Sequence, residues 1–241
     1  MGEEFCWEEL SPSLFICVSS AHKFGTDAFL LSDFAAPRRK DLCCDLGTGC
    51  GIIPLLWFRD DPPRLCYGAD IQKQAIEQLE QSIQKNGLKN RFIPLLTDLK
   101  ELSSLPCGPL DLVTCNPPYK AQGSGILSET DAERIARHEV LCTIEDVCQA
   151  ASRLLRFGGR LCLCQRPERL CDTLCAMRSA GIEPKRVRFV QQRPASAPWL
   201  FLVEGKKGSK PYMTVEPPLL VEGEGGFSQE ILRIYHKKEN L

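Results

Sequence analysis

The sequence predicts an α/β fold, in which helices cover both faces of a mostly parallel sheet. Short apolar runs alternate along the chain with longer amphipathic stretches, which is the pattern of strands linked by crossover helices. Two further apolar runs, 185–193 and 198–208, are joined by only a short loop, which favours an antiparallel pair at the end of the sheet. We therefore expect a sheet of seven strands, of which the last is antiparallel.

The alternating elements can be placed in chain order. The expected parallel strands are residues 41–47, 64–71, 91–98, 110–116 and 159–165. The expected helices are residues 52–59, 72–86, 143–156 and 168–180. Several of these helices end next to a glycine, which is typical of a helix C-terminus. The rhythm predicts one domain over 1–241, with an N-terminal cap and helix over the site (1–40), a core (41–210) and a C-terminal tail (211–241).

Composition limits the classes of protein to consider. The hydrophobic fraction of 43% is ordinary for a folded protein and can fill a substantial core. No run reaches the roughly 18 apolar residues of a membrane helix, and the acidic start does not resemble a targeting segment. The 14 cysteines include no Cys-x-x-Cys pair and lie mostly in apolar runs, which indicates core thiols rather than a metal site. We expect a cytoplasmic monomer without metal or membrane partner.

The first chemical signal is a glycine-rich turn in "DLGTGCG", between the first expected strand and its helix. Glycines allow a sharp turn and close approach to a ligand, and Asp70, 21 residues after Gly49, suits the hydroxyls of a ribose. A dinucleotide motif would have its third glycine where Ile52 stands, so S-adenosylmethionine is the expected cofactor. The alternative is a tight turn without a ligand. The residues expected to bind the cofactor here are Asp45, Gly47, Thr48, Gly49, Gly51, Asp70 and Ile71. Asp98 either meets the adenine amino group or caps the turn that follows it.

The second signal is "NPPY", residues 116–119, directly after the fourth expected strand. Proline fixes φ and donates no N–H, which leaves the Asn116 side-chain oxygen and the Pro117 carbonyl as rigid acceptors for an amino group. Asn116 would also face the cofactor. Tyr119 offers an aromatic face for a base, a contact worth about 1–3 kcal/mol. Asn116, Pro117 and Tyr119 are therefore the expected catalytic residues, unless the motif only ends a strand in a rigid turn.

Together with the glycine turn, "NPPY" resembles the class I methyltransferases that modify an amino nitrogen. Residues 22–35 and 116–139 are similar to the bacterial tRNA (adenine-N(6))-methyltransferases that act beside the anticodon of a valine tRNA. The resemblance implies a Rossmann-like fold. It also implies that Lys23, Gly25, Thr26 and Asp27 form a wall over cofactor and target base, and that Arg137, His138 and Glu139 shape a covering loop. The plainer readings are that Asp27 caps a helix and that Arg137 and Glu139 form a surface pair.

Charge is divided unevenly along the chain. Residues 1–150 carry 14 Lys and Arg against 22 Asp and Glu, a net of −8, whereas residues 151–241 carry 16 against 9, a net of +7. Basic residues concentrated in the later half are expected to contact tRNA phosphates, although a solvated polar face is the alternative. The expected RNA contacts are Lys120, Arg137, His138, Lys185, Arg186, Arg188, Lys206 and Lys207.

The resemblance implies methyl transfer from S-adenosylmethionine to N(6) of an adenine in tRNA, next to the anticodon of a valine tRNA. Two alternatives remain. A protein-glutamine methyltransferase acting on a release factor would meet the same delocalised nitrogen with the same motif. A scaffold that binds the cofactor without turnover would keep the glycine turn.

Overall fold

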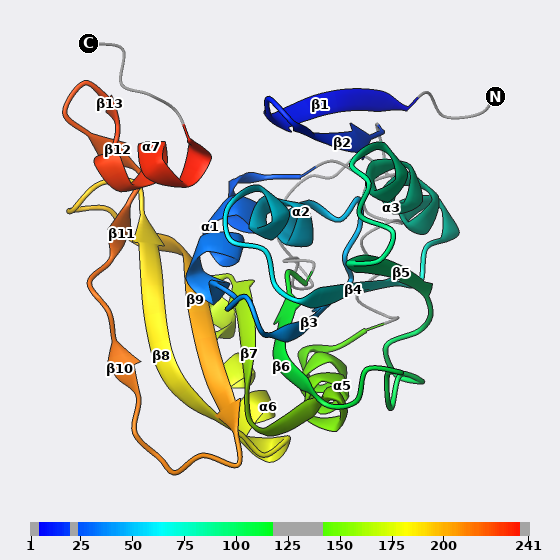
Figure 1. Cartoon of the computed structure of the whole chain (residues 1–241). Coiled ribbons are helices and arrows are strands. Elements are labelled where there is room, and N and C mark those ends of the chain that lie inside the picture. The colour runs from blue at the N-terminus through cyan, green and yellow to red at the C-terminus, as the bar shows by residue number, and fades with distance from the viewer. Residues whose placement is uncertain (1–4, 20–23, 118–141, 237–241) are drawn as a thin grey trace, which may run out of the picture.

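Seven strands lie side by side in the order β5, β4, β3, β6, β7, β9 and β8 (Figure 1). The computed structural model describes residues 5–19, 24–117 and 142–236. In that order the strands span Phe92–Leu96, Leu65–Asp70, Leu42–Leu46, Leu110–Cys115, Leu155–Gln165, Pro198–Lys207 and Ile182–Gln191. The first five are parallel to one another, and β9 runs antiparallel to both β7 and β8. The predicted sheet is therefore confirmed.

The strand order reverses between β3 and β6. The chain leaves β3 toward β4 and β5 and then returns to β6, which pairs with the other side of β3. In open α/β sheets, ligands bind beyond the carboxyl ends of the strands at such a reversal. The glycine turn follows β3 and "NPPY" follows β6, so the topology brings the two sequence signals to the same point.

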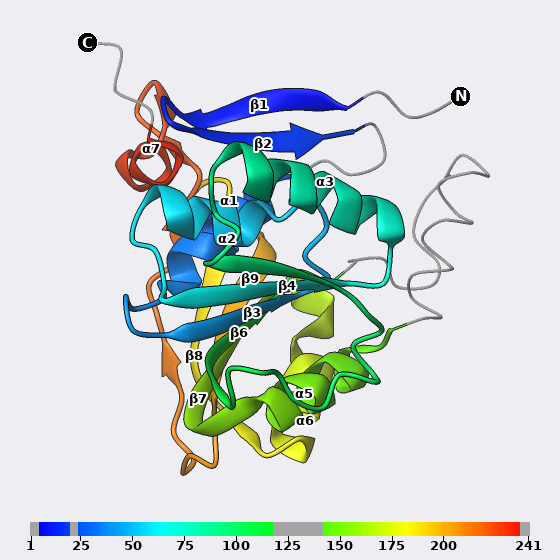
Figure 2. The same ribbon diagram turned by 45° about the vertical axis from the view of Figure 1, so that its right-hand side comes forward.

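Helices cover both faces of the sheet and enclose two apolar layers (Figure 2). On one face lie α1 (Thr26–Ala35), α2 (Ile52–Arg59) and α3 (Lys73–Lys85). On the other lie α5 (Ile144–Leu154) and α6 (Leu170–Ser179), which follows the short 3-10 helix η1 (Pro167–Arg169). The predicted helix 143–156 agrees with α5. Thr143 and Asp146 form a reciprocal capping box, which fixes the start of this helix.

One strand begins earlier than the sequence predicts. β7 starts at Leu155, directly after α5, and its register with β6 shifts between Leu110 and Leu112. Leu155 is opposite Leu110 whereas Arg160 is opposite Leu112, so the strand holds extra residues there. Gly158, with φ of 75°, lies within this irregular stretch. The glycine pair that suggests a strand start in the sequence is instead part of a bulge.

The N-terminal segment forms an antiparallel hairpin, which the sequence analysis does not predict. It consists of β1 (Cys6–Ser11) and β2 (Leu14–Val18) and lies on α3. Polar side chains of α3 bond to the backbone of β2: Ser82 Oγ accepts from Cys17 N at 2.9 Å. Asn86 accepts from Phe15 N at 2.9 Å and donates to Phe15 O at 2.6 Å. Helix side chains thus take the place of another strand, a long-range arrangement without a local sequence signal.

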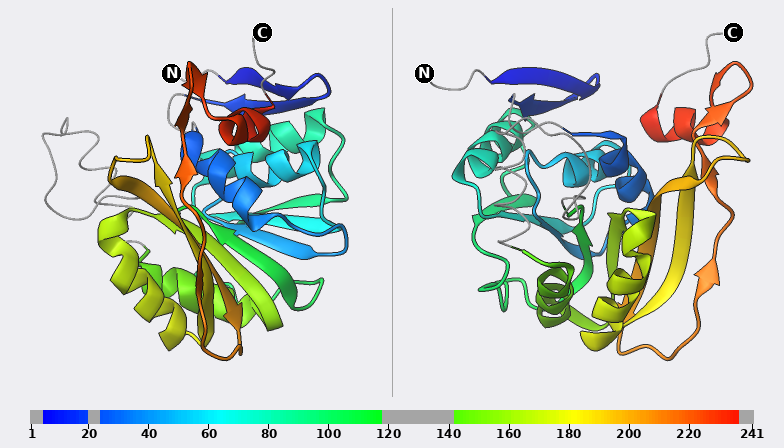
Figure 3. Two further views of the ribbon diagram at one scale, coloured as in Figure 1. Left: turned by 90° about the vertical axis from the view of Figure 1, so that its left-hand side faces the viewer. Right: turned by 180° about the vertical axis from the view of Figure 1, so that it is seen from behind.

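The C-terminal tail runs along the edge strand β8 (Figure 3). Short strands β10 (Thr214–Val215) and β11 (Leu219–Leu220) add parallel pairs to β8. A small hairpin of β12 (Glu222–Gly223) and β13 (Gly226–Phe227) precedes α7 (Gln229–Tyr235). The helix packs on α1 through Arg233, which donates two hydrogen bonds to Asp33 at 2.7 and 2.9 Å. The tail therefore covers the sheet edge and steadies α1.

Candidate active site

The glycine turn between β3 and α2 leaves room for a ligand. Gly47, Gly49 and Gly51 have φ of 68°, 54° and 83°, in the left-handed region that favours glycine. A Cβ on Gly47 or Gly49 would meet nothing within 4 Å, whereas one on Gly51 would lie 2.4 Å from Leu79 Cδ1. Gly47 and Gly49 thus border open space, and Gly51 allows α2 to pack closely against α3.

Asp70 ends β4 and holds the turn in shape. One carboxylate oxygen accepts from Gly49 N at 2.9 Å, and the other accepts from Gln72 N at 2.9 Å. The residue is 7% exposed and lines the cavity. A carboxylate oxygen has more than one acceptor site, so these bonds leave capacity for ribose hydroxyls, the predicted partners.

Asp45 lies beneath the turn rather than in the cavity wall. It is fully buried, and Thr114 on β6 donates to it from Oγ1 at 2.6 Å. Burial raises the pKa of Asp45 to about 7, against the opposing effect of the Thr114 hydrogen bond. Asp45 therefore joins β3 to β6 at the point where the cavity opens, and Thr48 is likewise buried behind the cavity.

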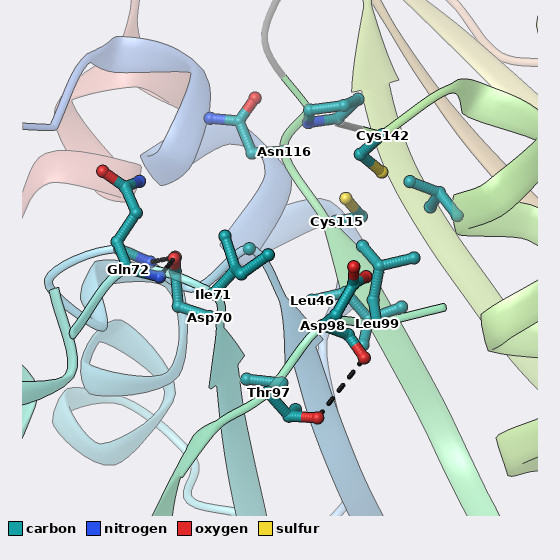
Figure 4. A pocket seen from close by; sticks show the side chains of 15 residues that line it. Leu46, Asp70, Ile71, Gln72, Thr97, Asp98, Leu99, Cys115, Asn116 and Cys142 are labelled. Carbon is teal, nitrogen blue, oxygen red and sulfur yellow. Dashed lines mark hydrogen bonds between the residues drawn. The ribbon is translucent and has the colours of Figure 1, made fainter. Parts of the chain in front are cut away.

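A cavity of about 280 Å³ lies between the turn and the end of β6 (Figure 4). Its lining includes seven predicted site residues, which are Gly47, Gly49, Asp70, Ile71, Asp98, Asn116 and Pro117. The sequence analysis does not single out Gln72, Thr97, Leu99, Cys142 and Val147, which also line it. Asp98 accepts from Lys100 N at 2.9 Å, so it caps the following turn and borders the cavity at once.

Asn116 is held at both ends of its side-chain amide. Its Nδ2 donates to Asp27 Oδ2 at 3.1 Å, and the thiol of Cys164 donates to its Oδ1 at 3.1 Å. Figure 4 shows the amide nitrogen turned toward α1, the helix that carries Asp27. The side chain is half-buried and lines the cavity together with Pro117. The predicted acceptor group thus stands in the same cavity as the glycine turn.

The N-terminal wall has a more specific geometry than a helix cap. Gly25 is the N-cap of α1, and no side chain caps this helix. Asp27 accepts from Ala28 N at 3.0 Å through Oδ1 while its Oδ2 meets Asn116. Thr26 hydrogen-bonds Tyr235 of α7. The other predicted wall residue, Lys23, lies outside the described residues, as do Tyr119, Lys120, Arg137, His138 and Glu139.

Two thiols in the cavity wall are protonated at neutral pH. Burial raises the pKa of Cys115 well above its usual value and that of Cys142 to about 11. Nucleophilic attack requires the thiolate, so neither sulfur is poised for covalent catalysis. The polar groups of the cavity are instead arranged for binding and orientation.

Three of the basic residues that are predicted to contact RNA bond to other groups of the protein. Arg186 bonds Glu204 and Glu216 and lies 3.9 Å from the centroid of the Phe34 ring. Arg188 donates to both oxygens of Glu230, and Lys207 donates to the carbonyls of Ser152 and Leu155. These interactions give the three residues structural roles, which hold β8, β9 and the tail together.

Lys185 and Lys206 are the other predicted RNA contacts among the described residues. Lys185 Nζ donates to a neutral acceptor, the carbonyl of Lys210, at 3.1 Å, and Lys206 is exposed. Lys206 lies opposite Arg160, which is itself opposite Leu112 in the first half of β6, whereas Asn116 follows the end of β6. Both lysines therefore lie toward the edge of the sheet away from the cavity.

Among the residues that the structure describes, no three His, Cys, Asp or Glu side chains gather into a group that could hold a metal ion. Nor does any helix in this part of the chain have both the length and the apolar character needed to span a bilayer.

Comparisons with known proteins agree with this geometry. The tRNA1(Val) (adenine(37)-N6)-methyltransferase of Parabacteroides distasonis is 29% identical over 185 residues, 76% of each chain. The enzyme of the same name from Tolumonas auensis is 28% identical over 218 residues, 89% of this chain and 88% of its own. The fold is similar to that of a predicted O-methyltransferase from Agrobacterium tumefaciens, with a TM-score of 0.69, 21% identity, and 88% and 96% of the two chains covered.

The family comparison covers most of the chain. The family model described as the methyltransferase small domain matches residues 18–177, which include the glycine turn, Asp70, Asn116 and Cys164. The described part of this span contains the whole cavity lining. The chain therefore belongs to the methyltransferase small domain family, whose members use S-adenosylmethionine as methyl donor.

Proposed function

We propose that this protein transfers a methyl group from S-adenosylmethionine to N(6) of an adenine in tRNA, next to the anticodon of a valine tRNA. The observation that carries the proposal is the meeting of two motifs in one cavity, since Asn116 and Pro117 line it together with Gly47, Gly49 and Asp70. The names of the relatives from Parabacteroides distasonis and Tolumonas auensis support the choice of acceptor.

The cavity residues fit the cofactor. Gly47 and Gly49 leave space that a Cβ would fill, at the start of α2, where backbone N–H groups and the helix dipole favour a carboxylate. Asp70 supplies an anionic acceptor at the end of β4, and the apolar side chain of Ile71, 45% exposed, stands beside it. We propose that these residues hold the methionine, ribose and adenine parts, respectively, while the bound cofactor supplies the electrophilic methyl group.

Asn116 and Pro117 act on the acceptor nitrogen. An exocyclic adenine nitrogen is a poor nucleophile because its lone pair is delocalised into the ring. Two oxygen acceptors on its hydrogens favour the pyramidal nitrogen that forms as the C–N bond is made. Preorganised acceptors of this kind act where charge develops, and alignment of the reacting groups can lower a barrier by roughly 7–11 kcal/mol.

The distribution of charge along the chain supports one-sided binding of tRNA. The acidic first half, with its net of −8, would repel a polyanion, whereas Lys185, Lys206 and Lys210 keep their charges on the later half. We propose that these lysines contact phosphates and that the segment 118–141, with Lys120, Arg137 and His138, contacts the target nucleotide. A tRNA substrate agrees with the expected cytoplasmic location.

The test is methylation of defined substrates with labelled S-adenosylmethionine. We expect label in tRNA, N(6)-methyladenine after nuclease digestion, and loss of label when the target adenine of the valine tRNA is replaced by guanine. Label in a release factor and none in tRNA would favour the protein-glutamine alternative. Cofactor binding without label in either substrate, or in RNA and protein of a cell extract, would favour the scaffold.

A further inference from the structure

The Asn116 amide is fixed by two residues from distant parts of the chain. Asp27, at the start of α1, is 89 positions away in sequence, and Cys164, near the end of β7, is 48 positions away. Neither belongs to the glycine turn or to "NPPY". Because β7 pairs with β6, with Leu163 opposite Cys115, Cys164 comes next to the residue that follows β6.

The two contacts select one orientation of the amide. Asp27 presents a carboxylate oxygen, which accepts from Nδ2, and Cys164 presents a thiol, which donates to Oδ1. If the amide were flipped, its oxygen would face the Asp27 carboxylate, which cannot donate, and the NH2 group would face Cys164, whose sulfur is only a weak acceptor. The pair therefore distinguishes the oxygen of Asn116 from its nitrogen, which an apolar environment would not do.

The bond to Asp27 makes Oδ1 a better acceptor. A hydrogen bond from Nδ2 to a carboxylate draws electron density toward the amide oxygen, and chains of such bonds strengthen one another. An amide oxygen has two acceptor positions, so the bond from Cys164 is compatible with a second bond from an amino group. Cys164 is fully buried, and so its thiol is held against Asn116 by the core.

Gly25 keeps space for this arrangement. A Cβ on Gly25 would lie 2.7 Å from Asp27 Oδ1, closer than real contacts allow. The backbone at Gly25 has φ of −115°, which any residue adopts, so the glycine is not needed for its conformation. Its small size matters because the carboxylate of Asp27 occupies the place that a side chain would take.

We propose that Asp27 and Cys164 are positioning residues, which hold the Asn116 amide with its oxygen available to the acceptor amino group and its nitrogen turned away. The proposal deepens the proposed function and, for its catalytic consequence, rests on it. The orientation itself does not depend on which amino group is methylated.

The orientation can be measured without any activity. The chain has four asparagines, Asn86, Asn90, Asn116 and Asn240, so selective ¹⁵N-asparagine labelling gives four side-chain NH2 signal pairs. Asn116→Ala identifies the Asn116 pair by its disappearance. We expect Cys164→Ala to shift this pair, Asp27→Asn to shift it as well while adding a fifth signal pair of its own, and Gly25→Ala to shift it less. The matched control is Cys43→Ala, which removes another fully buried thiol from the same apolar layer. Equal, negligible shifts in Cys164→Ala and Cys43→Ala would overturn the role of Cys164.

Kinetics then test the consequence for methyl transfer. Cys164→Ala should lower kcat about two- to tenfold, the loss expected for one neutral hydrogen bond, and Cys164→Ser should restore it because a hydroxyl also donates. Asp27→Asn should lower kcat about 10- to 100-fold, because a neutral amide replaces the charged acceptor and can present its own NH2 group to Asn116. The dissociation constant of S-adenosylmethionine and the kcat of Cys43→Ala should stay unchanged.

The two readouts separate failure of this proposal from failure of the proposed function. NMR shifts in Asp27→Asn and Cys164→Ala without tRNA methylation by the unmodified protein would support the orientation and contradict the function. tRNA methylation by the unmodified protein, with kcat equally unaffected in Cys164→Ala, Cys164→Ser and Asp27→Asn, would contradict the positioning role and leave the function standing.

Discussion

The two sides of the cavity are built in different ways. The proposed cofactor side consists of the glycine turn and Asp70. It is closed by backbone groups that are near in sequence, since Gly49 N bonds a carboxylate 21 positions later and Gln72 N bonds the same carboxylate. The proposed acceptor side is assembled by side chains that are distant in sequence. Asn116 bonds Asp27, which is 89 positions away, and Cys164, which is 48 positions away. The cofactor side therefore depends on backbone conformation, and the acceptor side depends on the correct packing of α1 and β7 around β6.

The largest expected effect concerns Asp45, which ties the cofactor side to β6. Its pKa is about 7 in the folded protein against 3.8 for an unperturbed aspartate, a difference of roughly 3 units or about 4 kcal/mol. The folded state binds the proton more tightly, so this contribution to stability is present below pH 3.8 and is lost as the pH rises to about 7. Asp45→Asn should remove this pH dependence, as measured by urea unfolding between pH 4 and 8. An unchanged slope would mean that Asp45 is ionised in the folded protein.

Asn116→Ala should separate the two sides most clearly. We expect kcat to fall about a hundredfold, roughly 2.7 kcal/mol, as for the loss of one preorganised polar group. Affinity for S-adenosylmethionine, measured by calorimetry, should be unchanged because the cofactor side keeps its backbone. A parallel loss of affinity would show that Asn116 belongs to both sides.

Gly49→Ala should have the opposite pattern. The substitution forces a side chain into the left-handed region and fills space at the cavity, so the dissociation constant of S-adenosylmethionine should rise about tenfold, roughly 1.4 kcal/mol. The kcat at saturating cofactor should change little. Gly87→Ala is the matched control, because Gly87 has φ of 67° and open space but does not line the cavity. Both variants should lose similar stability, and only Gly49→Ala should lose affinity; equal affinity in the two would contradict the role of the turn.

The difference between the sides also explains what the sequence could predict. The glycine turn, Asp70 and the succession of strands and helices follow from local patterns, because a strand, a turn and a helix are contiguous in the chain and their period is visible. Asn116 could be placed at the cavity because parallel strands share a carboxyl edge. Cys164 could not, since in "RLCLCQ" it looks like any apolar strand residue until the pairing of β6 with β7 is known.

Charge was harder to predict than topology. A run of basic residues indicates a positive surface only if no acids from other elements reach it, and sequence distance hides such partners. Arg188 meets Glu230, 42 positions away, and Arg186 meets Glu216, 30 positions away. The hairpin β1–β2 was unpredicted for a similar reason, because its partner is a helix face rather than a neighbouring strand. Long-range pairing decided each of these cases.

The smallest expected effect distinguishes the basic residues from one another. Lys206 is exposed, so Lys206→Gln should leave stability unchanged and reduce the slope of log affinity for tRNA against log salt by about 1, the loss of one phosphate contact. Arg186 bonds Glu204 and Glu216, so Arg186→Gln should instead lower the free energy of unfolding, because Glu216 loses this cation and, among the described residues, Glu204 keeps only Arg160. Binding at several salt concentrations and urea unfolding give both values for each variant. An unchanged salt slope in Lys206→Gln would mean that tRNA binds another surface. It would not affect the roles proposed for the two sides of the cavity.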